Sequence, residues 1–315
     1  MKKIIIDADP GIDDSIAIML AAGLSHFDIL GITIVSGNVC VDKGAVNALR
    51  LSKFLKKDFN IYKSNPNPLV KELINAEDTH GEDGLGETYL PYEDREVKDG
   101  AVDFIIENLK KDEVTIFALG PLTNIARAME KDIDAFKCAR IISMGGNFKS
   151  FGNMSPVSEF NYYVDPEAAD YVIQNSPNPI EIIPLDVTRK FVLTPNIIAL
   201  MKSINKDVAD FLENITNFYM DFHLKYENII GSVINDPLVI MAHEFPEYFA
   251  KEKYHADVVC DGKARGMLMV DEKDFLKKEK NIILYRDIKT FPVWKNFIEI
   301  LTAGEVDEEM LERIL

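Results

Sequence analysis

A run of three isoleucines at residues 4–6 ends directly at an acidic stretch that holds four aspartates within eight residues. The acidic residues are Asp7, Asp9, Asp13 and Asp14, with Pro10 and Gly11 between them. The β-branched run predicts a buried strand, and ionised carboxylates crowded at its end repel one another and lose hydration. The pattern therefore predicts a bound cation, and carboxylate oxygens favour a hard ion such as Ca²⁺.

A simpler interpretation of this stretch is a turn followed by a helix N-terminus. The Pro-Gly pair has turn chemistry, and Asp13 and Asp14 lie where a helix favours negative charge. A helix cap requires only one carboxylate, however, and Asp7 and Asp9 remain on the strand side. Capping alone therefore does not explain the cluster.

Short β-branched runs alternate with helical patterns along the chain. Strands are predicted at residues 3–7, 29–36, 59–62, 114–119, 139–144 and 180–184, and helices at residues 15–22, 41–55, 101–110, 122–129 and 166–174. This alternation is typical of βα units. It predicts an α/β, Rossmann-like fold with a mostly parallel sheet flanked by helices.

The polar stretches follow the predicted strands. They are residues 7–14, 37–38, 120–124 and 145–147, together with a long polar loop at residues 150–165. In open α/β sheets ligands bind at the carboxyl ends of the strands. We therefore expect these stretches to meet at one binding site.

The C-terminal third predicts additions to this fold. Residues 206–243 have a mainly helical pattern with several aromatic residues, most of which we expect in the core. Residues 255–259 and 282–285 predict added strands packed on the main sheet, and residues 290–301 predict a last helix. No internal repeat or linker divides the chain, so a single domain over residues 1–315 is expected.

The composition limits the possible partners. Hydrophobic residues make up 47% of the chain, which supports a sizeable core, and the net charge is −17. Nucleic acids and anionic membranes are bound through Lys and Arg surfaces, so neither is expected as a partner. A neutral or cationic small molecule is the better match.

The sequence favours a cytoplasmic protein. Cys40, Cys138 and Cys260 are odd in number and far apart, so their spacing builds neither a disulfide framework nor a zinc motif. The basic residues 1–3 are followed by only three apolar residues, too few for a signal peptide.

The acidic stretch resembles the N-terminal fingerprint of the inosine-uridine type nucleoside hydrolases, and eight further matches follow in the family's order. These are Gly37-Asn38, His80-Gly81 with Asp83-Gly84-Leu85-Gly86, Gly120-Pro121-Leu122-Thr123-Asn124, Met144-Gly145-Gly146, Gly152-Asn153, Glu159-Phe160-Asn161, Asp165-Pro166-Glu167-Ala168-Ala169 and Asn235-Asp236-Pro237. The resemblance implies Ca²⁺-dependent hydrolysis of the N-glycosidic bond of ribonucleosides, giving ribose and free base. It also implies a homodimer or a homotetramer.

By resemblance, the metal ligands are the carboxylates of Asp9, Asp14 and Asp236 and the backbone carbonyl of Leu119. Asp9 is also the expected general base, acting on a Ca²⁺-bound water, and the transition state is expected to be oxocarbenium-like. Asp7 is expected to support this group from behind, without touching the ion.

The resemblance also assigns the ribose contacts. Asn153 and Glu159 are expected near the 5′-hydroxyl, and Asp13, Asn38 and Asn161 near the 2′- and 3′-hydroxyls. Without the resemblance, each of these asparagines has an ordinary alternative role in stabilising a loop.

The base side of the site is less defined. His80 lies in a Gly-rich segment that reaches over the nucleobase in the family. Well-known members have a histidine directly before the last metal-binding aspartate, but this chain has Asn235, which cannot act as a Brønsted acid near neutral pH. His223, Tyr226 and Glu227 are candidates to replace that histidine. Stacking on the base by Phe148, Phe151 or Tyr162 is a further possibility from the long loop.

Two other functions compete with hydrolysis of nucleosides. The presence of Asn235 raises the alternative of a nucleoside-binding protein with reduced or lost turnover. An apolar strand that ends in Asp-x-Asp also begins metal-dependent phosphohydrolases of the haloacid dehalogenase type, which predicts Thr or Val where this chain has Pro10. That alternative also leaves residues 152–161 unexplained.

Overall fold

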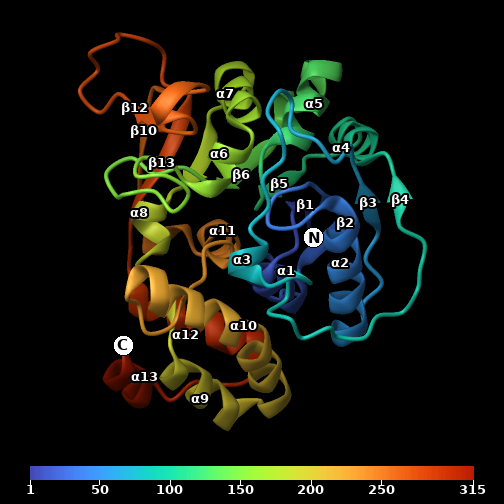
Figure 1. Ribbon diagram of the computed structural model, residues 1–315, viewed down its shortest axis with the longest axis vertical. Coiled ribbons are helices and arrows are strands. Elements are labelled where there is room, and N and C mark those ends of the chain that lie inside the picture. Colours follow the sequence, from blue (N-terminus) through green and yellow to red (C-terminus); the bar gives the residue numbers. More distant parts are fainter.

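A nine-stranded sheet forms the centre of the protein in the computed structural model, which describes residues 1–315 (Figure 1). The strand order is β10-β13-β7-β6-β5-β1-β2-β3-β4. The strands of this sheet are β1 (Lys2–Ala8), β2 (Phe27–Ile34), β3 (Ile61–Lys63), β4 (Lys98–Asp99), β5 (Thr115–Ala118), β6 (Arg140–Met144), β7 (Ile180–Ile183), β10 (Phe249–Tyr254) and β13 (Ile282–Ile288). All neighbouring pairs are parallel except β10 and β13. The predicted α/β class with a mostly parallel sheet is confirmed.

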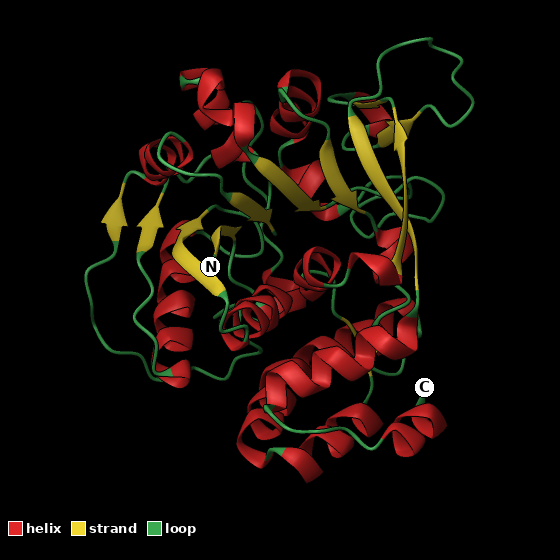
Figure 2. Ribbon diagram, turned by 180° about the vertical axis from the view of Figure 1, so that it is seen from behind, coloured by secondary structure: helices red, strands yellow, loops and turns green.

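Helices cover both faces of this sheet (Figure 2). They are α1 (Ile12–Gly23), α2 (Val41–Leu55), α3 (Glu77–His80), α4 (Ala101–Leu109), α5 (Thr123–Lys131), α6 (Phe160–Val164), α7 (Pro166–Asn175), α8 (Leu185–Thr188), α9 (Pro195–Ile204), α10 (Lys206–Glu227), α11 (Pro237–Glu244), α12 (Thr290–Thr302) and α13 (Glu308–Ile314), with short 3-10 turns at Ile133–Cys138, Pro246–Tyr248 and Gly262–Ala264. None of them combines the length and the apolar character that crossing a bilayer requires.

Strand β1 shows why the sheet is buried on both sides. Ile4 and Ile6 pack into one hydrophobic core and Ile5 into the other, because successive side chains of a strand point to opposite faces. A continuous apolar run is typical of such a parallel strand.

The chain changes direction in the sheet between β1 and β5. From β1 it proceeds outward to β2, β3 and β4, and it then returns to the other side of β1 for β5, β6 and β7. The loops after β1 and β5 therefore separate at their carboxyl ends. This topological switch point is where ligands bind in open α/β sheets.

The predicted boundaries needed local corrections. Helix α1 starts at Ile12, three residues earlier than predicted, because the Asp14 carboxylate accepts a hydrogen bond from Gly11 N (3.0 Å) and so caps the first turn. Strand β3 covers Ile61–Lys63, not residues 59–62, and β4, β10 and α3 were not predicted.

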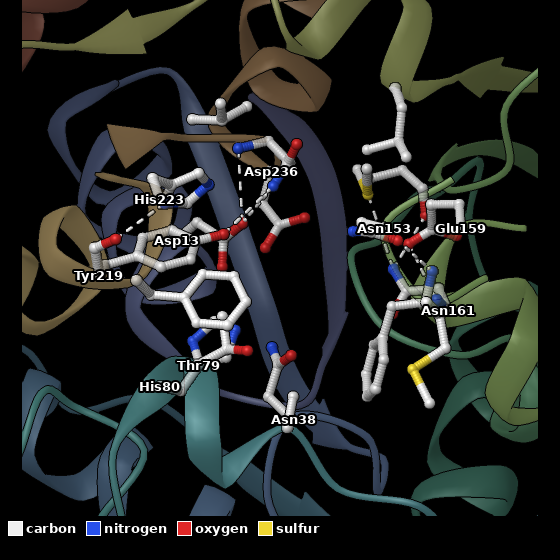
Figure 3. Close-up of a pocket in the computed structure, with 18 of the residues that line it drawn as sticks. Asp13, Asn38, Thr79, His80, Asn153, Glu159, Asn161, Tyr219, His223 and Asp236 are labelled. Carbon is white, nitrogen blue, oxygen red and sulfur yellow. Dashed lines mark hydrogen bonds between the residues drawn. The ribbon is translucent and has the colours of Figure 1, made fainter. Parts of the chain in front are cut away.

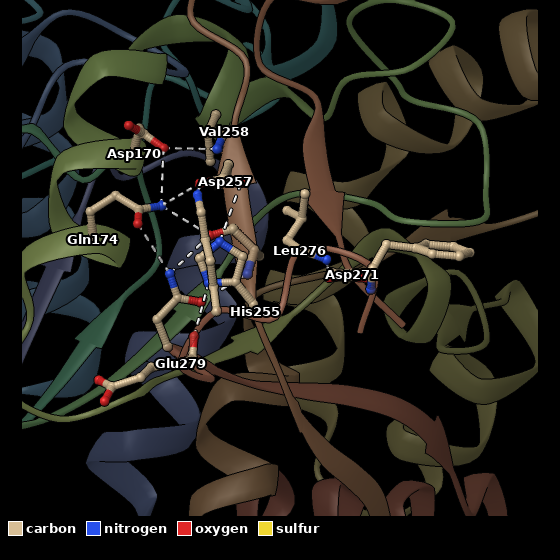
Figure 4. A network of polar contacts seen from close by, with 12 residues as sticks. Asp170, Gln174, His255, Asp257, Val258, Asp271, Leu276 and Glu279 are labelled. Atoms are coloured by element: carbon tan, nitrogen blue, oxygen red, sulfur yellow. Dashed lines mark hydrogen bonds and ion pairs between the residues drawn. The ribbon is translucent and has the colours of Figure 1, made fainter. Parts of the chain in front are cut away.

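Residues 255–259 were wrongly predicted to extend the main sheet. They contain β11 (Ala256–Val258), which pairs only with β12 (Leu268–Val270) in a separate hairpin. Figure 4 shows why: Asp170 of α7 accepts a hydrogen bond from Val258 N (2.9 Å), and Gln174 donates to the carbonyl of Ala256 (3.0 Å). The hairpin is thus bonded to a helix. A second small pair joins β8 (Val192–Leu193) and β9 (Ser232–Val233).

Candidate functional site

A cavity of about 570 Å³ opens at the carboxyl ends of the central strands. Its walls come from the loops that follow β2, β3, β5 and β6, together with the start of α1, α3, α10 and the start of α11. In Figure 3, Glu159, Asn161 and Asn153 lie opposite Asp13, Tyr219 and His223. Polar residues after β1 and β2 and from the long loop therefore meet in one place as expected, whereas residues 120–124 and 145–147 do not border the cavity.

Three carboxylates, two of them bordering the cavity, form a group that could hold a metal ion. Oxygens of Asp13, Asp14 and Asp236 all lie within 4.8 Å of one another, and all three residues are buried. Burial, and then repulsion by the neighbouring aspartates, raises the pKa of Asp14 and of Asp236 well above the ordinary value. Such a group gains most from an external cation.

Asp14 is held rigidly inside this group. Its carboxylate accepts hydrogen bonds from Asp9 N (3.2 Å), Gly11 N (3.0 Å) and Asn38 Nδ2 (2.9 Å). Helix α1 and the loop after β2 therefore fix the direction of one predicted metal ligand.

Asp9 lies just behind the cavity wall. Asn38 N donates to its Oδ2 (2.6 Å), whereas its Oδ1 is fully buried and has no hydrogen-bond partner. Gly37 and Gly120 allow the carboxylate to fit, since a Cβ at either position would lie within 2.1 or 2.4 Å of its oxygens. Burial raises the pKa of Asp9 to about 7. A buried oxygen without a partner, beside an all-oxygen donor set, fits a hard cation.

Asp7 supports the strand end from deeper in the fold. It is directly beside Thr33 in the β1–β2 register, and its Oδ1 accepts from Thr33 Oγ1 (2.5 Å) and from Asn124 Nδ2 (2.8 Å). Burial raises the pKa of Asp7 to about 7. Asp7 is not part of the group formed by Asp13, Asp14 and Asp236, as is expected of a residue that supports the site without touching the ion.

Leu119 and Asn161 connect β5 to the long loop. The backbone carbonyl of Leu119, a predicted metal ligand, accepts a hydrogen bond from Asn161 Nδ2 (2.7 Å) and borders the cavity. A carbonyl oxygen has a second lone pair, which leaves it able to bind an ion as well.

Glu159 caps α6. Its carboxylate accepts hydrogen bonds from Asn161 N (2.8 Å), Gly146 N (2.9 Å) and Tyr162 N (3.2 Å). Burial nevertheless raises its pKa to about 7, since the backbone donors offset the loss of hydration only in part. Asn153, at the exposed rim, accepts from Phe160 N (2.9 Å).

On the base side, His80 has a defined tautomer. Its Nδ1 accepts a hydrogen bond from Ile12 N (3.1 Å), so the neutral ring has its proton on Nε2. Burial lowers the pKa of His80, which keeps the ring neutral. The ring lies 5.2 Å from that of Tyr219 between centroids.

His223 and Asn235 face the same region. His223 Nδ1 pairs with the carbonyl of Tyr219 (2.8 Å), and its Nε2 has no protein partner. Burial lowers the pKa of His223. Asn235 Nδ2 donates to Asp13 Oδ2 (3.0 Å), so this asparagine holds a carboxylate of the predicted ribose site.

Tyr226 is not a base-side residue, contrary to the sequence-based expectation. It is 62% exposed and does not border the cavity. One residue corresponds to about 100° of helical rotation, so Tyr226 points away when its neighbour Glu227 points inward. The suggested stacking residues are also wrong: Tyr162 is fully buried against Gly145, and neither Phe148 nor Phe151 borders the cavity.

Glu227, which the sequence offered as a base-side candidate, does border the cavity, whereas sequence reasoning missed Arg189, Tyr219 and Phe222 among the other lining residues. The i, i+4 spacing of Tyr219, His223 and Glu227 is a signal that could have identified one face of α10. Arg189 has no such signal. It donates to the carbonyls of Phe151 and Gly152 and lies 3.7 Å from Glu227.

Comparison with known proteins agrees with this geometry. Residues 4–295 match the model of the inosine-uridine preferring nucleoside hydrolase family. The chain belongs to this family. The pyrimidine-specific ribonucleoside hydrolase RihB of Shigella flexneri is 34% identical over 298 residues, which cover 93% of this chain and 95% of that protein. This nucleoside hydrolase family member is thus an enzyme that acts on N-glycosyl compounds, with ribonucleosides as the substrate class.

Solved structures show the same fold. A plant nucleoside hydrolase, PpNRh1, superposes with a TM-score of 0.91 at 30% identity and covers 96% of this chain and 99% of its own. A purine-preferring ribonucleoside hydrolase from Gardnerella vaginalis gives a TM-score of 0.89 at 28% identity, with both chains fully covered.

Proposed function

We propose that this nucleoside hydrolase uses Ca²⁺ and the Asp9 carboxylate to cleave the N-glycosidic bond of ribonucleosides, in nucleoside salvage or breakdown. The observation that carries the proposal is the group formed by Asp13, Asp14 and Asp236, whose oxygens lie within 4.8 Å of one another, with Asp13 and Asp236 bordering the cavity. None of these three carboxylates has a Lys or Arg within salt-bridge distance. Asp9, the third carboxylate ligand that the resemblance assigns, lies outside this group and behind the cavity wall.

The carboxylates of Asp9, Asp14 and Asp236 and the carbonyl of Leu119 would hold the ion. When bound, Ca²⁺ supplies Lewis acidity that makes an adjacent water easier to deprotonate. All four ligands are oxygens, which suits Ca²⁺ better than a transition metal.

Asp9 is the general base in this proposal. Its Oδ1 has no protein partner, whereas Asn38 N fixes Oδ2 at 2.6 Å. One oxygen is therefore anchored and the other has no competing protein donor, and the fully buried carboxylate lies behind the cavity wall. A positioned base of this kind accelerates a reaction by about 10²- to 10⁴-fold.

The ribose is oriented by side chains on both walls. Glu159 and Asn153 belong to one loop and are proposed to bind the 5′-hydroxyl, and Asn161 extends the same wall toward Leu119. Asp13 and Asn38 border the cavity on the opposite side and, with Asn161, are proposed to bind the 2′- and 3′-hydroxyls. Carboxylates around the sugar would also stabilise positive charge as the C1′–N bond breaks.

Departure of the base is assisted by His80 in this proposal. Its Nε2–H is the available donor, because Nδ1 is engaged by Ile12 N. His223 also borders the cavity, but its Nδ1–H donates to the carbonyl of Tyr219, so Nε2 of the neutral ring can accept and not donate a hydrogen bond. Asn235 acts indirectly by holding Asp13 (3.0 Å), and not as an acid.

The experiment that tests the proposal measures reducing sugar and free base after incubation with uridine, cytidine, inosine, adenosine and guanosine, with Ca²⁺ or with EDTA. Ca²⁺-dependent release of both products is expected. Saturable binding without release would favour the alternative of a nucleoside-binding protein. The panel also determines base preference, since RihB is named pyrimidine-specific and the Gardnerella enzyme purine-preferring.

The proposed assembly is a homodimer or a homotetramer in the cytoplasm, without nucleic-acid or membrane partners. The net charge of −17 supports the exclusion of polyanionic partners. Analytical ultracentrifugation measures the subunit number, and a monomer would contradict the proposed assembly.

A further inference from the structure

Two loops that carry site residues are joined by one side chain outside the cavity. Asn47, on α2, is fully buried, and its Nδ2 donates to the backbone carbonyls of Pro10 (2.8 Å) and Asp83 (2.9 Å). Pro10 belongs to the turn that leads to Asp13 and Asp14. Asp83 belongs to the segment that directly follows His80.

Asn47 is itself held in place. Its Oδ1 accepts a hydrogen bond from Arg50 Nη1 (2.9 Å), and the same nitrogen reaches Asp83 Oδ2 (3.2 Å). The other oxygen of Asp83 accepts from Leu85 N (2.8 Å) and Glu87 N (2.9 Å). The amide of Asn47 therefore connects the turn to an ordered segment.

Glycines at both contact points allow a close approach that no side chain would permit. A Cβ at Gly84 would lie 2.8 Å from Asn47 Nδ2, and Gly84 also has a positive φ of +78°. A Cβ at Gly11 would lie 2.6 Å from His80 Nδ1. The backbone of the turn and that of the loop are thus closely packed around Asn47 and His80.

The orientation of His80 depends on this packing. The hydrogen bond from Ile12 N to His80 Nδ1 (3.1 Å) sets the ring only if the turn keeps its position relative to residues 80–84. Asn47 bridges the same two segments at Pro10 and Asp83, within three residues of each end of that bond. A shift of about 1 Å at a reacting group can cost about 100-fold in rate.

We propose that Asn47 is a positioning residue for departure of the nucleobase: it fixes His80 relative to the carboxylates without touching the substrate. The inference rests on the proposed function, in which His80 donates to the leaving base. Asn47 does not border the main cavity, so it acts through the two loops.

The test measures kcat/KM of the wild type and of Asn47→Asp on two substrates. This substitution nearly preserves the side-chain volume, but it places an oxygen where Nδ2 now faces two carbonyl oxygens. Uridine requires help for its base to leave, whereas 4-nitrophenyl β-D-ribofuranoside releases a stable anion without protonation. We expect kcat/KM to fall on the order of 10- to 100-fold for uridine and by less than about threefold for the nitrophenyl riboside. The ratio of the two values does not depend on the fraction of folded protein.

Asn178→Asp is the matched control. Asn178 Nδ2 also reaches two backbone carbonyls, those of Lys137 (2.9 Å) and Ala139 (3.5 Å), but on the exposed loop before β7. Its substrate ratio should equal that of the wild type. If Asn47→Asp does not fold, Arg50→Met is used for the test, because it removes the hydrogen bond to Asn47 Oδ1. It should lower the ratio of kcat/KM for uridine to that for the nitrophenyl riboside, by a smaller factor than Asn47→Asp.

The possible results separate the inference from the function on which it rests. An equal fall on both substrates, or no fall on either, overturns the role of Asn47 while leaving the hydrolase intact. A wild-type protein that cleaves neither substrate overturns the proposed function, and the inference with it.

Discussion

Two buried acidic sites at the same sheet differ in whether the protein supplies a cation for their negative charge. Glu181, on β7, pairs with Arg140 (2.5 Å), Lys251 (2.8 Å) and the Tyr285 hydroxyl (2.7 Å). Burial alone would raise its pKa, but the hydrogen bonds from Arg140 and Lys251 outweigh this and lower the pKa to about 2.

The acidic group of the cavity has no such cations. Asp14 and Asp236 are held by uncharged donors or by none, and burial raises the pKa of each. The Glu181 site has its cations within the protein, whereas the cavity site has no Lys or Arg partner. The contrast supports the proposal that the cavity acids bind an ion, whereas Glu181 stabilises the fold.

The largest expected effect is that of Asp9→Ala. The change removes the general base and a metal ligand together, so kcat should fall by about 10²- to 10⁴-fold or more. Product release from uridine measured with saturating Ca²⁺ is the test. A fall of only a few-fold would show that Asp9 is not the base.

Removal of Ca²⁺ should destabilise the protein as well as inactivate it. At a Ca²⁺ concentration 100 times the Kd, binding to the native state contributes about 2.7 kcal/mol of stability, which calorimetry detects as a higher Tm. The double variant Asp14→Asn, Asp236→Asn should lose this shift, while Glu181→Gln should keep it. If the Tm of the wild type does not change when Ca²⁺ is added, the proposed ion site is wrong.

Glu181→Gln should lower the free energy of unfolding by about 2 kcal/mol at pH 7. This loss is smaller than that for a fully buried ion pair, because Arg140 and Lys251 retain some access to water. The folded pKa is depressed to about 2 from an ordinary 4.5, so this stability is present above pH 4.5 and is lost as the pH falls through about 2. Urea unfolding should therefore show that the difference in unfolding free energy between the wild type and Glu181→Gln becomes smaller from pH 7 to pH 2. If this difference in unfolding free energy does not depend on pH, the ion-pair explanation is wrong.

Asn235→His has the smallest expected effect. We expect a gain in kcat on inosine or uridine of less than about tenfold, because His80 already borders the base region with its Nε2–H available as a donor. Steady-state kinetics on both substrates measures it. A larger gain would show that the missing acid limits the reaction.

Much of the fold could be predicted from the sequence because its signals are local. The isoleucine run of β1 and the polar stretches after the strands each identify an element or a site loop from a few neighbouring residues. The edge strands were harder: β11 looks like a strand of the main sheet, and only the contacts of Asp170 and Gln174 assign it elsewhere.

The site was predictable to the extent that it lies in motifs. Asp14 and Asp236 were predicted from the family resemblance and do lie together. Tyr226 was misplaced because one residue changes the direction of a helical side chain by about 100°, and sequence does not fix the rotation of α10. Arg189 could not be found at all, since its partners Gly152 and Glu227 are distant in sequence.

The contact between Asp13 and Asn235 has a consequence for how the enzyme matures. These residues are 222 positions apart, so the proposed ion site requires the start of α1 and the start of α11 to have come together. Closing so long a loop is a late and costly event in folding. Ca²⁺ affinity would then appear only at the end of refolding, and the time course of ion uptake would report completion of the native state.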